Sequence, residues 1–125
     1  MIFIMHHVIG FQFSRMPNGG EKDLSNKNYI SGAGFESRFI RHLIHIGQAV
    51  KAGRFFASKG ITDVWWVDQN GVHNEAQCKY SKNKPYIKPQ ELRRLKSFAK
   101  LVSGIIKVWI VKKQSRKPTV MEALN

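Results

Sequence analysis

Four polar residues in the middle of the chain are of the types that bind metal ions and activate water. Glu36 lies in an amphipathic segment, and Asp63 opens a later apolar run. Gln77 and Lys79 flank Cys78, the single cysteine. Carboxylate and amide oxygens suit a hard cation such as Mg²⁺, and a lysine beside the metal can position a water molecule. Together these residues indicate metal-dependent hydrolysis of a phosphodiester.

The apolar aromatic run that Asp63 opens, over 63–67, predicts a buried strand. The segment 68–71, Asp-Gln-Asn-Gly, predicts a hairpin turn, because Asn-Gly accepts positive φ. The partner strand is expected at 72–80. A tight hairpin makes these two strands adjacent, so Asp63 should lie close to the polar residues of the second strand.

Alternate residues of a strand point to the same face. Gln77 and Lys79 should therefore share one face, and Cys78 should point away from them as a small filler of the core. Glu75 shares the face of Gln77 and would offer a carboxylate if the site were shifted along the strand. A reactive thiol at Cys78 is the less favoured alternative.

The remaining elements are predicted from apolar spacing and from residues that break helices. Apolar side chains recur every three or four residues after Ser31 and predict a helix that ends at Gly47. A second helix should begin at Pro89. Strands are expected at 49–56 and at 105–111, the latter in the centre of the sheet. The order of elements predicts an α/β domain with a mixed sheet.

The chain of 125 residues is long enough for one domain with a single core. Residues 1–28 are expected to be an N-terminal extension or flexible segment, 29–117 the catalytic domain, and 118–125 a C-terminal tail or short helix. The apolar start is too short to span a bilayer and lacks the basic region of a signal peptide, so we expect no membrane association. One cysteine allows no intrachain disulfide and favours a cytoplasmic location.

The charge of the chain is strongly positive and unevenly distributed. The net charge is +13 and the isoelectric point about 10.3. Residues 79–117 hold thirteen Lys or Arg and one acid, Glu91, whereas the first 78 residues hold eight bases and six acids. Such asymmetry indicates a polyanionic partner. The expected phosphate contacts are Arg38, Arg41, Arg54, Lys59, Lys82, Lys84, Lys88, Arg93 and Arg94. Gln90 is expected either to contact DNA or to hold the active-site loop.

Several short motifs together resemble those of a known enzyme group. They are Gly34-Phe35-Glu36, Gly60-Ile61-Thr62-Asp63-Val64, Gln77-Cys78-Lys79, Tyr86-Ile87 and Gln90. Their order and spacing, over residues 29–112, resemble the PD-(D/E)xK nuclease superfamily. Within it, the resemblance is to the archaeal-type Holliday junction resolvases, which phages and viruses also carry. Thr62 stands where that pattern has Pro, and Gln77 where it has Glu. The Gln-x-Lys form resembles the Mrr-type restriction endonucleases of the same superfamily.

The resemblance implies a small restriction-endonuclease-like domain, in which helices flank a mixed central β-sheet. It implies a catalytic set of Glu36, Asp63, Gln77 and Lys79, with Ser58 either touching the scissile phosphate or serving as an ordinary loop residue. Asp63, Gln77 and Glu36 would hold Mg²⁺, for which Mn²⁺ is a possible substitute. The implied setting is the cytoplasm of a prokaryotic cell or of a phage-infected host.

The function that this resemblance implies is resolution of four-way DNA junctions by a homodimer, since two paired nicks need two active sites. The alternatives are an Mrr-like restriction or repair nuclease acting on duplex DNA, and a catalytically weakened DNA-binding module. Tyr86 would either stack at an opened junction or pack within the fold. The dimer surface is expected among the aromatic residues Phe55, Phe56, Trp65, Trp66 and Trp109.

Overall fold

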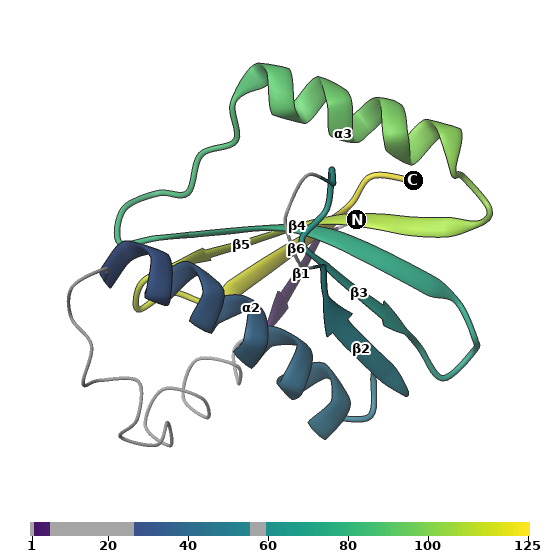
Figure 1. Cartoon of the computed structure of the whole chain (residues 1–125), viewed down its shortest axis with the longest axis horizontal. Coiled ribbons are helices and arrows are strands. Elements are labelled where there is room, and N and C mark those ends of the chain that lie inside the picture. Colours follow the sequence, from purple (N-terminus) through teal and green to yellow (C-terminus); the bar gives the residue numbers. More distant parts are fainter. Residues whose placement is uncertain (1, 6–26, 56–59) are drawn as a thin grey trace.

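The computed structural model describes residues 2–5, 27–55 and 60–125 and shows a six-stranded sheet between two helices (Figure 1). The predicted α/β class is confirmed, and so is the predicted order of elements from the first long helix to the central strand. In chain order the elements are β1 (Ile2–Met5), α2 (Lys27–His45), β2 (Lys51–Arg54), β3 (Val64–Val67), β4 (His73–Ser81), α3 (Pro89–Leu101), β5 (Ile106–Gln114) and β6 (Thr119–Ala123).

The sheet is mixed, as predicted. Its strand order is β1-β6-β5-β4-β3-β2. β4 and β5 form the parallel pair, and the other neighbours are antiparallel. Parallel neighbours need a crossover, and α3 supplies it between β4 and β5. β5 is therefore an inner strand, as its branched apolar residues indicated.

The hairpin between β3 and β4 turns where the sequence predicts it. Asp68 Oδ1 accepts hydrogen bonds from the backbone N–H groups of Asn70, at 2.9 Å, and Val72, at 3.0 Å. Gly71 has φ of 78°, a value that side chains disfavour and glycine accepts. The turn fixes the register in which Val64 lies opposite Ala76.

Each helix covers one face of the sheet, and each face has its own core (Figure 1). On α2, Phe35, Phe39 and Leu43 recur every four residues and are fully buried in a cluster that includes Cys78. On the opposite face Leu95 of α3 is buried in the second cluster. Because Cys78 points toward α2, its neighbours on β4 point toward α3. None of the helices in the described part of the chain is long and apolar enough to cross a membrane.

The sheet extends beyond the predicted domain at both ends of the chain. Residues 119–123 form strand β6, which differs from the predicted tail or short helix. β6 pairs with β5, and Thr119 and Met121 on it are buried. Residues 2–5, within the predicted extension, form β1 and pair with β6.

The aromatic residues expected at a dimer surface are divided by the fold. Trp66 and Trp109 are only 4% and 7% exposed and belong to the core under α2, so this expectation is wrong for both. Trp65 is half-buried and packs against Gly53, while Phe55 is 38% exposed. Phe56, the remaining aromatic residue expected at the dimer surface, lies outside the described residues. So do Ser58, expected in catalysis, and Lys59, expected to contact phosphate.

Candidate active site

The backbone of the β3–β4 hairpin fixes the position of the Asp63 carboxylate. The Asp63 N–H donates to the Ala76 carbonyl at 2.8 Å, as in an antiparallel ladder. The Cys78 N–H instead donates to Asp63 Oδ2, at 2.9 Å. The side chain thus takes the place of a backbone carbonyl just before β3 begins at Val64, beside the part of β4 that continues to Ser81. The sheet opens there, and the carboxylate is held in the opening.

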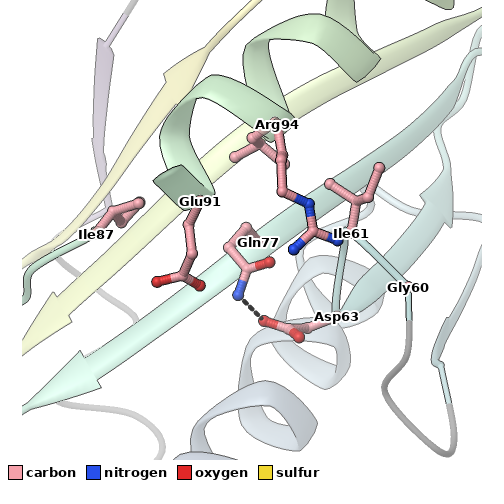
Figure 2. A pocket seen from close by; sticks show the side chains of 8 residues that line it. Gly60, Ile61, Asp63, Gln77, Ile87, Glu91 and Arg94 are labelled. Carbon is pink, nitrogen blue, oxygen red and sulfur yellow. Dashed lines mark hydrogen bonds between the residues drawn. The ribbon is translucent and has the colours of Figure 1, made fainter. Parts of the chain in front are cut away.

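Gln77 lies beside this carboxylate, as the alternation of the strand predicts. Its Nε2 donates to Asp63 Oδ2 at 2.9 Å (Figure 2). The same oxygen therefore accepts from both Gln77 and Cys78. Lys79 lies on the same face of β4 as Gln77. The structure brings Asp63 and Gln77 into direct contact and places Lys79 within electrostatic reach of Asp63.

A pocket of about 260 Å³ opens over Asp63 and Gln77. The first turns of α3 form its other side, where Glu91 and Arg94 point toward the same space (Figure 2). These two residues are three apart on a helix, so they share a face. The remaining lining is small or apolar and comes from Gly60, Ile61, Ile87 and Leu95. The lining of the pocket therefore includes charged groups of both signs, the carboxylates of Asp63 and Glu91 and the guanidinium of Arg94.

Glu91 is the site residue that the sequence did not assign. Its Oε2 lies 3.0 Å and its Oε1 3.3 Å from Lys79 Nζ. Oε1 also accepts a long hydrogen bond, 3.4 Å, from the Lys88 N–H at the start of α3. The pKa of Glu91 is lowered, first by the hydrogen bond from Lys79. The signal in the sequence was its isolation as the one acid among thirteen bases over residues 79–117.

The pKa of Asp63 lies above its ordinary value. Burial raises it, and the nearby carboxylate of Glu91 raises it further. The Cys78 N–H, Lys79 and Arg54 act in the opposite direction but do not cancel the effect of burial. Negative charge at Asp63 is thus stabilised incompletely by the protein alone. A cation at the pocket would complete it.

Glu36 approaches this site from the other helix. It lies on α2 and forms an ion pair with Arg54, at 3.0 Å between Oε1 and Nε. Burial raises the pKa of Glu36, and so does the charge of Asp63. Glu36 is therefore near Asp63 electrostatically, although it is not among the residues that line the pocket. Its role as a metal ligand stays a prediction.

The two alternatives on β4 have structural roles of their own. Glu75 accepts a hydrogen bond of 2.6 Å from Thr62 Oγ1 and does not line the pocket. Cys78 is buried under α2, where desolvation raises the pKa of its thiol well above the ordinary value. A thiol in that state is not nucleophilic, because the thiolate is the reactive form. Cys78 is therefore a core residue, as predicted.

The donors at the pocket fit a cation that is bound together with a phosphate. Mg²⁺ in proteins commonly has one or two carboxylate ligands, substrate phosphates and several waters. Asp63 and Glu91 provide two carboxylates on the pocket wall. Gln77 presents its N–H₂ group to Asp63, so its amide must turn to offer its oxygen to a cation. Within the described ranges, no three or more His, Cys, Asp or Glu side chains are grouped as a preformed metal site.

Most of the expected phosphate contacts are exposed at the surface. Two of them, Arg38 and Arg54, are half-buried. Arg54 forms an ion pair with Glu36, and burial lowers the pKa of Arg38. Lys59 lies outside the described residues, as does the catalytic candidate Ser58. Arg94 is the one that lines the pocket itself. The exposed members of the set are Arg41, Lys82, Lys84, Lys88, Arg93 and Arg94, and Gln90 is exposed as well.

The chain was also compared with known proteins. No family model, no curated protein and no solved structure matches it. Its function must therefore be inferred from the geometry and charge of the pocket at Asp63.

Proposed function

We propose that this protein is a metal-dependent endonuclease that cuts four-way DNA junctions. The observation that carries the proposal is the position of Asp63 in the opening of the sheet, in contact with Gln77 and facing Glu91 across one pocket. The order of α2, β2 to β4, α3 and β5 also suits the restriction-endonuclease-like domain that the sequence motifs imply. The basic surface around the pocket supplies the affinity for DNA.

In this proposal Mg²⁺, or Mn²⁺ in its place, is held by Asp63 and Gln77, with Glu36 reached through water. Glu91 supplies the carboxylate that Gln77 lacks, because it faces Asp63 from α3. The chemistry that Mg²⁺ supplies when bound is polarisation of the scissile phosphate. A metal bound jointly with the phosphate needs only a partial protein ligand set, which is what the pocket offers.

Lys79 acts on the attacking water and on the charge that develops during cleavage. Its Nζ is held at 3.0 Å from Glu91 Oε2, so the ammonium is oriented before substrate binds. A fixed cation beside the reacting phosphate stabilises the added negative charge of the transition state. Arg94, on the same wall as Glu91, is placed to bind a non-bridging phosphate oxygen.

The preference for a branched substrate rests on charge and on two-fold symmetry. Contacts of Lys and Arg with DNA phosphates position the protein on the DNA but carry no information about the base sequence. Two copies related by a two-fold axis would present two pockets to the two strands that must be cut.

The test is a cleavage assay on a four-way junction and on linear duplex of the same sequence, each with Mg²⁺. We expect paired nicks near the branch of the junction and little cutting of the linear DNA. The Asp63→Asn variant should lose cleavage and keep junction binding. Equal cutting of both DNAs would favour the duplex nuclease instead, and no cutting by the unaltered protein with either Mg²⁺ or Mn²⁺ would overturn the proposal.

A further inference from the structure

A second pocket lies beside the active-site pocket, on the face of the sheet that α3 covers. Its volume is about 440 Å³. The loop after β4 contributes Tyr86 and Ile87, and the inner wall includes Ile110 of β5. Ile87 also lines the pocket of Asp63 and Gln77. The two pockets are therefore neighbours that share one wall.

Tyr86 is more exposed than a residue of the core would be. It is 69% exposed although it lines the second pocket. An aromatic ring with that exposure buries little area and so contributes little to folding. It does offer a flat face on which a nucleobase can stack. Of the two roles that the sequence left open, exposure favours stacking over packing.

The charges of the second pocket suit one nucleotide. Lys84 and Lys96 are exposed at its margin, and Lys112 of β5 is half-buried beside them. The single acid of the lining, Glu122 of β6, lies opposite Ile110 in the register of the sheet. The apolar wall and the carboxylate of Glu122 disfavour a phosphate in the interior of the pocket. The exposed Lys84 and Lys96 favour phosphates at the margin, outside the pocket.

We infer that the second pocket holds one unpaired deoxynucleotide of the strand that is cut, next to the scissile phosphate. This inference rests on the proposed function and adds the feature that recognises a branch. The base would stack on Tyr86, and the strand would pass over Ile87 into the active-site pocket. A base at a branch point leaves its stack at lower cost than a base inside a continuous duplex. Branched DNA would then be selected by occupancy of this pocket.

The first experiment measures the binding of a labelled four-way junction and of linear duplex without divalent cations, so that nothing is cut. Tyr86→Ala should weaken junction binding by roughly 5- to 150-fold, the range for loss of one stacked base. Binding of linear duplex should not change. Tyr86→Phe keeps the ring and should bind as the unaltered protein does. Because Tyr86 is exposed, both variants should keep the unaltered melting temperature.

A second pair of variants tests the charges at equal net charge. Lys96 and Lys100 are both exposed on α3, but only Lys96 lines the second pocket. Lys96→Ala should reduce the preference for junction over linear DNA, and Lys100→Ala should leave that preference unchanged. An equal effect of the two variants would count against the inference.

The outcomes separate the inference from the proposed function. If the unaltered protein binds junction and linear DNA equally, both are overturned. If it prefers and cuts the junction while Tyr86→Ala keeps the full preference, the inference alone is overturned. If it prefers the junction but never cuts it, the proposed activity fails, and the response of Tyr86→Ala still decides the role of the pocket.

Discussion

Lys79 Nζ on β4 contacts both carboxylate oxygens of Glu91 on α3, at 3.0 Å and 3.3 Å. The ion pair joins a strand and a helix that a loop of seven residues, 82–88, separates in the chain. It also joins two groups with different roles in the proposed reaction, since one stabilises charge and the other holds a cation. The ion pair therefore couples the position of Lys79 to that of Glu91.

Asp63→Asn should abolish metal-dependent cleavage, with a loss of at least about 100-fold. The amide keeps an oxygen for the Cys78 N–H, so the opening of the sheet should be preserved. Junction binding should stay within about two-fold of the unaltered protein, because the basic surface is untouched. Gel assays of cleavage and of binding check the two parts separately. Cleavage retained by this variant would show that the site is assigned wrongly.

Glu91→Gln should raise the Mg²⁺ concentration that gives half-maximal cleavage, because one carboxylate of the pocket is lost. Adding Gln77→Glu should restore the original requirement, since it returns a carboxylate to the same pocket. Mg²⁺ titration by calorimetry, with a non-hydrolysable junction present, should show the same loss and recovery.

Glu75→Gln is the matched control for this pair. Glu75 is on the same strand face but outside the pocket, and its carboxylate accepts from Thr62. Its substitution should leave the Mg²⁺ requirement unchanged. If the double variant is no better than Glu91→Gln alone, Glu91 has only the structural role of holding Lys79 and the start of α3.

Lys79→Met should lower the rate of cleavage by about 10²- to 10³-fold and leave the affinity for the junction almost unchanged. The expected effect is on turnover because Nζ is paired with Glu91, a residue that lines the pocket. Single-turnover kinetics at saturating protein measure the chemical step directly. A variant that cuts normally once bound would remove Lys79 from the catalytic set.

The raised pKa of Asp63 predicts a pH-dependent cost to stability. The folded protein binds a proton at Asp63 more tightly than the unfolded chain, whose Asp pKa is about 3.9. Stability from this group is therefore present below that pH and is lost as pH rises through the folded value. Asp63→Asn should melt at a higher temperature than the unaltered protein at pH 7, and the difference should vanish near pH 3.5.

The metal should reverse this difference. Mg²⁺ with a non-hydrolysable junction should raise the melting temperature of the unaltered protein more than that of Asp63→Asn, because the charged carboxylate gains a partner. The difference in melting temperature between the two proteins could instead be the same at pH 3.5 and at pH 7. That result would show that ionisation of Asp63 does not lower the stability of the folded protein.

Junction affinity should fall steeply with salt. A protein that neutralises six to ten phosphates loses roughly 10³- to 10⁵-fold in affinity between about 50 and 200 mM salt. Fluorescence anisotropy with a labelled junction gives the slope, and unlabelled linear DNA serves as competitor. Linear DNA that competes as well as the junction at moderate salt would leave only a general DNA nuclease.

The central part of the fold could be predicted because local signals agree there with tertiary structure. The turn at Asp68–Gly71 fixes the hairpin, and period-two alternation then sets which side chains of β4 face Asp63. Pro89 marks the start of α3 correctly for a similar reason. In each case one short stretch of sequence contains the whole physical cause.

Strand β6 and the role of Glu91 had no such local cause. The sequence Thr-Val-Met-Glu-Ala has mixed propensity, and it becomes a strand because β5 and β1 pair with it on either side. Glu91 occupies a position where an acid ordinarily stabilises the start of a helix. Only the crossover from β4 to β5 places that helix end beside Lys79.

The hydrogen bond from the Cys78 N–H to the Asp63 carboxylate makes this amide a natural spectroscopic probe. A nucleus so close to the carboxylate senses its charge, so the nitrogen and proton resonances of Cys78 should shift when Asp63 takes up a proton or gains a cation. The same amide should exchange slowly with solvent deuterium only while that bond persists. The chemical state of the pocket can thus be followed from one backbone signal, without any label in the site itself.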